Sequence, residues 1–151
     1  MNQDPAPYQI WLGGSCDYGH QERAGGAAVV IERDGSTIDS DVISDLRTTE
    51  FRMMLQLMIR TMKRLPARSS LLFLTNAAYI LNFDKPPTAK SANPDLIRQC
   101  IEEKKRHDQV EVKIVPYHKS PLLITTHQMA TDAMSRIRKE YAAQLKAGKS
   151  R

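Results

Sequence analysis

Three extended segments precede any helical pattern in this chain, and a two-residue turn fixes how two of them pair. Asp34-Gly35 lies between an apolar, β-rich run and a segment that alternates polar and apolar residues. This dipeptide favours a tight hairpin, so the segments on either side are predicted to be antiparallel neighbours. The three predicted strands are Tyr8–Leu12, Gly25–Arg33 and Thr37–Ile43. An antiparallel unit is therefore expected to open the fold.

Helical and extended patterns alternate in the rest of the chain. Between Asp45 and Leu65 the apolar residues recur at helical spacing, and Pro66 ends the pattern. The methionines of this helix other than Met54 are expected to pack in the core. The remaining predicted elements are strands at Ser69–Thr75 and Val110–Val115, helices at Ala77–Leu81 and Pro94–Arg106, and a C-terminal helix with an apolar stripe from Ala130 to Leu145. This order indicates an α/β fold with a mixed sheet.

Length and composition indicate one globular domain. A chain of 151 residues fits a single core. Residues 1–7 are predicted to be a disordered N-terminal segment, 8–145 the domain, and 146–151 a basic C-terminal tail. The 22 Lys and Arg against 17 Asp and Glu give a net charge of +5, which favours a polyanionic partner such as nucleic acid.

Cysteine usage and hydropathy exclude several other classes. Cys16 and Cys100 lie far apart, form no CxxC pair and have no clustered histidines beside them, so neither a disulfide scaffold nor a zinc site is expected. No apolar run approaches the length of a membrane span, and the first residues lack the pattern of a signal peptide. We expect a cytoplasmic protein with no membrane partner. The sequence leaves the oligomeric state and the biological process open.

Five short segments carry a resemblance to a known family. They are Leu12-Gly13-Gly14-Ser15-Cys16, Gly25 to Val30, Thr48-Thr49-Glu50-Phe51-Arg52-Met53-Met54-Leu55, Leu74-Thr75-Asn76-Ala77-Ala78-Tyr79 and Gln128-Met129-Ala130-Thr131-Asp132. Together they resemble the ribonuclease H family over about residues 8–138. The resemblance implies a ribonuclease H-like fold, in which a mixed five-stranded sheet is flanked by helices.

Members of that family cut the RNA strand of an RNA/DNA hybrid with two magnesium ions held by four carboxylates. At the corresponding positions this chain has Gly13, Met54 and Asn76, and only a vestigial Asp132 is acidic. Magnesium requires hard oxygen ligands, and the carboxylates must also offset two dipositive charges. The resemblance therefore implies a degenerate active site that holds no metal. The alternative is a hybrid endoribonuclease with a relocated site, in which Asp17, Glu50 and Asp132 bind Mg²⁺.

Other positions that match the family suggest contacts with nucleic acid. Ser15 and Cys16 match its strand-end contact with the hybrid, Thr48 and Thr49 match a pair at a helix start, and His118 matches a mobile-loop histidine. The threonines and the histidine also have a structural interpretation: a threonine at a helix start is commonly an N-cap, and a histidine in a surface loop can have no function. The basic residues of the C-terminal helix, which either contact phosphates or form a solvated face, are Arg136, Arg138 and Lys139.

The leading hypothesis is a catalytically inactive ribonuclease H-like domain that binds RNA/DNA hybrid or duplex, or serves in a nucleic acid assembly. A second hypothesis is a protein-interaction tether, in which the cleft around Met54 receives an apolar side chain of a partner. The third is the relocated nuclease. No cofactor is expected unless that third hypothesis holds.

Overall fold

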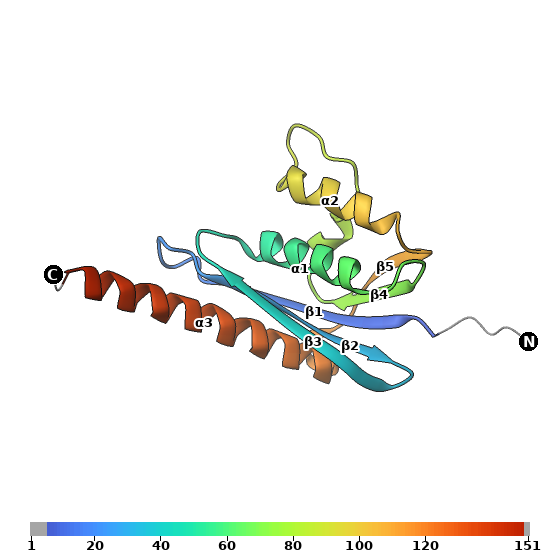
Figure 1. The fold of residues 1–151 in the computed structure, drawn as a ribbon, viewed down its shortest axis with the longest axis horizontal. Coiled ribbons are helices and arrows are strands. Elements are labelled where there is room, and N and C mark those ends of the chain that lie inside the picture. Colours follow the sequence, from blue (N-terminus) through green and yellow to red (C-terminus); the bar gives the residue numbers. More distant parts are fainter. Residues whose placement is uncertain (1–5, 150–151) are drawn as a thin grey trace, which may run out of the picture.

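The computed structural model describes residues 6–149, which form one mixed five-stranded sheet in the order β3-β2-β1-β4-β5 (Figure 1). β1 pairs antiparallel with β2, and β2 with β3, whereas β4 is parallel to β1 and β5 is parallel to β4. The strands are β1 (Tyr8–Cys16), β2 (Gly25–Arg33), β3 (Ser36–Asp45), β4 (Ser70–Thr75) and β5 (Gln109–Ile114). The predicted fold class, an α/β fold with a mixed five-stranded sheet, is confirmed.

The predicted hairpin joins β2 to β3. Asp34 and Gly35 both have positive φ, 54° and 77°, as a type I′ turn requires. β3 continues to Asp45 because Asp45 pairs with Gly25, so the strand is longer than its sequence pattern predicts.

Helices cover both faces of the sheet (Figure 1). α1 and α2 lie on one face, and α3 lies on the other and extends past the sheet toward its C-terminal end. The helical segments are α1 (Glu50–Arg64), the short 3-10 helix η1 (Ala78–Asn82), α2 (Pro94–Lys104), the 3-10 turn η2 (Tyr117–Lys119) and α3 (Pro121–Lys149).

Two predicted helix boundaries are corrected. α1 begins at Glu50 rather than Asp45, because the side chain of Thr49 accepts a hydrogen bond from the Arg52 backbone N–H and caps the helix. α3 begins at Pro121, well before the predicted stripe, and is 29 residues long. It includes residues 146–149 of the predicted basic tail. The rest of that tail and residues 1–5 of the predicted N-terminal segment lie outside the described residues.

The core lies between the sheet and α1. The strand residues Ile10, Leu12 and Phe73 are fully buried there. All four methionines of α1 are buried: Met53, Met58 and Met62 as predicted, and Met54 against the prediction of a cleft around it. A helix that buries residues on several sides is held chiefly by this packing.

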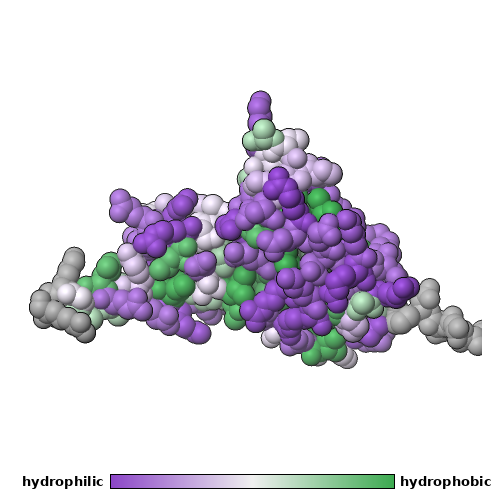
Figure 2. Space-filling model, turned by 45° about the horizontal axis from the view of Figure 1, so that its top comes forward, coloured by the Kyte–Doolittle hydropathy of each residue, from purple (hydrophilic) through white to green (hydrophobic). Residues whose placement is uncertain are grey.

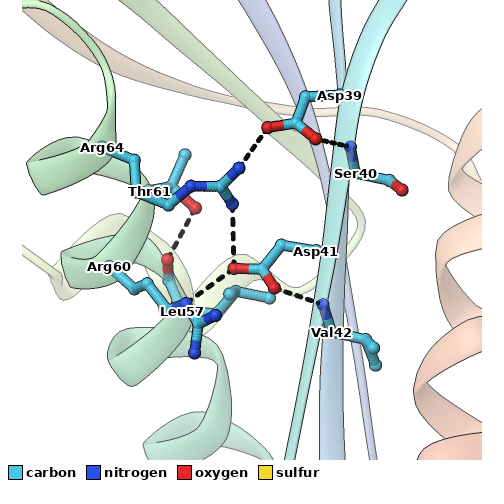
Figure 3. Close-up of polar contacts among 8 residues, drawn as sticks. All are labelled: Asp39, Ser40, Asp41, Val42, Leu57, Arg60, Thr61 and Arg64. Carbon is cyan, nitrogen blue, oxygen red and sulfur yellow. Dashed lines mark hydrogen bonds and ion pairs between the residues drawn. The ribbon is translucent and has the colours of Figure 1, made fainter.

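Ion pairs fasten the edge strand β3 to α1 (Figure 3). Asp41 Oδ2 lies 2.8 Å from Arg60 Nε and 3.0 Å from Arg64 Nη1, and Arg64 also pairs with Asp39. A shared set of charges between two elements is worth more than an isolated surface pair. It also places inward-pointing charges on an exposed strand, a common protection against edge-to-edge association.

The outer surface is mainly hydrophilic on the face shown in Figure 2, where hydrophobic residues form small, separate patches. No helix among residues 6–149 is long and apolar enough to cross a membrane.

Candidate functional site

The ends of β1 and β4 bring together two of the predicted site positions. β1 and β4 run parallel with Trp11 opposite Leu74, so the same register places Gly13 level with Asn76, which directly follows β4. Asn76 is exposed, and its Oδ1 lies 3.0 Å from Nε2 of His127 on α3. The imidazole of His127 also forms a hydrogen bond with the backbone of Gly14. Three separate segments therefore meet at His127.

His127, and not Asp132, occupies the helix position facing Asn76. Asp132 lies five residues further along α3, which is about 140° around the helix axis. Its exposed carboxylate accepts a hydrogen bond from Gln128 Nε2 at 2.9 Å and lines a shallow hollow beside Val42 of β3. The predicted placement of Asp132 at the site is wrong, because the residue that faces the sheet depends on where α3 begins.

A helix-start signal in the sequence could have identified His127. The chain has Pro121 as the first residue of α3, a position where proline is favoured. Counting from Pro121 places residue 127 on the second turn, near the end of the sheet. Anchoring the comparison on Asp132, the one acid in that segment, led to the later residue.

α3 fills the space that a side chain at position 13 would need. A Cβ at Gly13 would lie 2.7 Å from Thr126 Oγ1 and 2.9 Å from the backbone nitrogen of His127. These are shorter than ordinary contacts, and one of them is to backbone. The helix is therefore packed directly on β1 at the point where the family carries its first acid.

Met54 is buried, which corrects the predicted apolar opening. Its side chain is 1% exposed, and its sulfur lies 3.5 Å from the Tyr79 hydroxyl. A Cβ at Gly14 would come within 2.7 Å of Met54 Cγ, so the methionine packs directly against the glycine backbone. A partner's side chain cannot reach Met54 without displacing these neighbours.

The carboxylate of Glu50 lies beside this group, and two tyrosines form hydrogen bonds with Glu50. Its side chain accepts a hydrogen bond from the Tyr79 hydroxyl, and its backbone N–H donates to the Tyr18 hydroxyl at 3.0 Å. Burial raises the pKa of Tyr79, and the hydrogen bond to Glu50 raises it further. Tyr79 is therefore a neutral donor to Glu50 at physiological pH.

The other acids proposed for a relocated site lie in separate contacts. Asp17 pairs with Arg138 at 2.5 Å and with His20 at 2.8 Å, and the Arg138 bond is the main cause of its lowered pKa. Asp132 faces β3, as described above, and Glu50 is bonded to Tyr79. Among residues 6–149, no group of three or more His, Cys, Asp or Glu side chains could hold a metal ion.

Four residues predicted to contact nucleic acid have structural partners within the chain. Thr49 is the N-cap of α1, and Thr48 is 3% exposed with its methyl group against Gly25. The Ser15 hydroxyl lies 3.5 Å from Met134 Sδ, and Cys16 Sγ lies 3.5 Å from the Thr48 carbonyl oxygen. The threonines thus fix the start of α1, while Ser15 and Cys16 remain partly exposed.

The predicted basic residues do not form one surface. Arg138 is paired with Asp17, whereas Arg136 lines a hollow with Val42 on the β3 side of α3. Lys139 is exposed on α3. His118 is exposed on η2, with its ring 5.3 Å from that of Tyr117. The ring of Tyr117 also packs against that of His127, with centroids 5.0 Å apart. His118 therefore lies close to the site.

Solved structures resemble this chain in fold. The crystal structure of LC9-RNase H1, a type 1 RNase H with the type 2 active-site motif, has a TM-score of 0.73, with 19% identity over 89% of this chain and 75% of that chain. The N-terminal RNase H domain of rv2228c from Mycobacterium tuberculosis, solved as a fusion with maltose-binding protein, has a TM-score of 0.74, with 12% identity over 90% and 99% of the two chains.

The chain has a ribonuclease H-like fold. No family model matches it, and no curated protein matches it by sequence. At these identities the likeness extends to the fold alone.

The residues at this ribonuclease H-like site do not fit a pair of magnesium ions. Two such ions need several charged oxygen ligands facing one space. The positions offer the bare backbone of Gly13, the buried thioether of Met54, and the neutral amide of Asn76 bonded to His127. Imidazole and thioether groups are also poor ligands for a hard cation.

The titration of His127 should make folding sensitive to acid. Burial lowers the pKa of His127, although the Glu50 charge and the Gly14 hydrogen bond act in the opposite direction. Below the ordinary histidine pKa of about 6.5, the unfolded chain takes up a proton that the folded chain resists, so stability decreases as pH falls. Between about pH 7 and about pH 5, we expect the wild type to lose more unfolding free energy than His127→Gln, which has no group that titrates at position 127. Urea denaturation across this range measures it, and a difference independent of pH contradicts it.

Proposed function

We propose that this chain is a ribonuclease H-like domain that binds nucleic acid and does not cleave it by two-metal chemistry. The observation that supports the lack of two-metal cleavage is that Gly13, Asn76 and His127 lie together. The backbone positions converge as the fold requires, and none of the three side chains is a carboxylate. Met54, the fourth position, is buried.

Two exposed basic side chains without ion-pair partners in the described part of the chain support nucleic acid binding. Arg47 lies just before α1 and is held there by its backbone hydrogen bond to Glu22, while its exposed side chain has no ion-pair partner among residues 6–149. Lys119, at the end of η2, is likewise exposed and without such a partner among the described residues. Lys119 lies close to Tyr117 at the site, whereas Arg47 lines a hollow with Tyr141 and Leu145 toward the C-terminal end of α3. Both cations can neutralise phosphates of a bound strand.

The two alternative functions have weaker support. The tether lacks the apolar contact predicted at Met54, since that side chain is buried. The relocated nuclease would need Asp17, Glu50 and Asp132 to leave their present partners and converge.

Purified protein tests the proposal with RNA/DNA hybrid, duplex and single strands. We expect no cleavage in Mg²⁺ or Mn²⁺, and binding that weakens linearly in log-log form with salt concentration. Arg47→Gln and Lys119→Gln should each weaken binding and reduce the salt slope by about 1. The matched control is Arg98→Gln, since Arg98 is an exposed arginine on α2 whose neighbours include Glu102 and Glu103.

Two results would contradict the proposal. Metal-dependent cleavage that Glu50→Gln abolishes would establish a working nuclease site. Absence of binding to all three nucleic acids at about 50 mM salt, where phosphate contacts are strong, would remove the binding function. Arg136→Gln with Lys139→Gln tests separately whether the basic residues of α3 take part.

A further inference from the structure

Aromatic side chains are concentrated at the ribonuclease H-like site. The chain has nine aromatic residues, namely one Trp, five Tyr and three Phe. Tyr18, Phe51, Tyr79 and Tyr117 lie at the site, and none of them is buried. Of the other five, three are buried in the structure; they are Tyr8, Phe73 and Phe83. The site thus holds most of the aromatic surface that solvent can reach.

Each of these aromatic residues is tied to the site by a specific contact. Tyr18 and Tyr79 bond to the backbone and side chain of Glu50, and Phe51 packs edge-on against Tyr79 with ring centroids 5.1 Å apart. On the other side, Tyr117 packs edge-on against His127. A Cβ at Gly14 would lie 2.9 Å from Glu50 Cγ, and a Cβ at Gly13 would lie 2.9 Å from the His127 backbone nitrogen, so the two aromatic groups flank the end of β1.

Two of the rings expose much of their surface. Tyr18 is 61% exposed and Tyr79 is 36% exposed. Their hydroxyl groups are already bonded to Glu50, so the rings are held in place while their faces remain in contact with water. A fixed aromatic ring can stack on a nucleobase with little further loss of side-chain freedom.

The charges of the site favour bases over phosphates at its centre. Glu50 repels phosphate, whereas a carboxylate can accept hydrogen bonds from the N–H groups of bases. The exposed Asn76 amide and the His127 ring add neutral polar groups. The unpaired cations Arg47 and Lys119 lie outside this centre, Lys119 on η2 close to Tyr117 and Arg47 in a hollow with Tyr141 and Leu145. This arrangement suits a strand whose bases turn toward the centre and whose phosphates lie away from Glu50.

We propose that the site binds a single-stranded nucleic acid segment whose unpaired bases stack on Tyr18 and Tyr79. Bases in a duplex already stack on one another, so their faces are not available to these rings. The inference rests on the proposed function, because it names the form of nucleic acid that the same site takes.

A pair of substitutions at Tyr18 separates the ring from its hydroxyl. Tyr18→Phe removes the hydrogen bond to the Glu50 backbone and keeps the stacking surface, whereas Tyr18→Leu removes both. We measure fluorescence anisotropy with a labelled RNA of about 12 nucleotides, within the usual range of single-strand site sizes, and with the same RNA paired to DNA. Circular dichroism and thermal unfolding establish that both variants fold. Ile38→Ser, at an exposed residue of β3, is the surface control.

We expect the wild type to bind the single strand about tenfold more tightly than the hybrid, consistent with one or two stacked bases. Tyr18→Phe should bind only about twofold more weakly than the wild type, because it keeps the ring and loses the bond that fixes it, and Tyr18→Leu about tenfold more weakly. A 2-aminopurine base in the strand should lose fluorescence on binding to the wild type and much less with Tyr18→Leu.

The other outcomes distinguish this inference from the proposed function. Equal or tighter binding of hybrid, or single-strand binding that Tyr18→Leu leaves unchanged, overturns the stacking inference and leaves nucleic acid binding intact. Failure to bind any nucleic acid overturns both.

Discussion

Restoring the family's acids by Gly13→Asp, Met54→Glu and Asn76→Asp is expected to remove much of the domain's stability rather than to create a magnesium site. A side chain at position 13 collides with Thr126 and with the backbone of His127, and overpacking of this kind costs about 1–3 kcal/mol. Met54 is 1% exposed, so a glutamate there is buried without a partner and costs about 3–5 kcal/mol. Domains of this kind have only about 5–15 kcal/mol in total. Urea denaturation followed by circular dichroism measures the loss.

Asn76→Asp alone is the matched control for the triple variant. Asn76 is exposed, and a carboxylate at position 76 can still accept the hydrogen bond from His127. We expect this variant to unfold cooperatively with a change of about 1 kcal/mol or less, as for most surface substitutions. If the triple variant instead folds and binds magnesium by calorimetry, then α3 can move away from β1 and the site is more open than its packing indicates.

Local signals in the sequence were sufficient for most of the fold. The Asp34-Gly35 turn, the helical spacing of α1 and Pro94 at the start of α2 each depend on residues close together in the chain. The helix boundaries were less predictable because they depend on tertiary partners. Asp45 belongs to β3 since Gly25 pairs with it, and no pattern near Asp45 reports that pairing.

The site was predictable where it depended on strand ends and not where it depended on helix register. Asn76 directly follows β4, so the motif around it was sufficient to place it at the site. His127 was missed because the resemblance was placed on Asp132, five residues later, and five residues turn a side chain about 140° around the helix. The burial of Met54 was also not predictable, since it results from Gly14 on β1 and Tyr79 on η1 closing over it.

The close packing of α3 on the sheet should make Gly26 highly sensitive to substitution. A Cβ at Gly26 would lie 2.4 Å from the carbonyl oxygen of Ala130, an atom of the helix backbone. Because this neighbour cannot rotate away, Gly26→Ala must push α3 off β2. We expect a loss of about 3 kcal/mol or more in unfolding free energy, at the upper end for overpacking. Urea denaturation measures the loss, and NMR of the His127 ring reports whether its contact with Asn76 is broken.

Two further alanine substitutions separate this collision from a general effect of replacing glycine. Gly148 lies in α3, and no atom is within 4 Å of a Cβ added there. Gly148→Ala should therefore be neutral or slightly stabilising. At Gly14 the nearest atoms are Met54 Cγ at 2.7 Å and Glu50 Cγ at 2.9 Å, which belong to flexible side chains. Gly14→Ala should therefore cost less than Gly26→Ala. A loss of stability at Gly26 as small as that at Gly14 would mean that α3 adjusts its position easily. The close packing of His127 against Gly13 would then not explain why position 13 lacks a side chain.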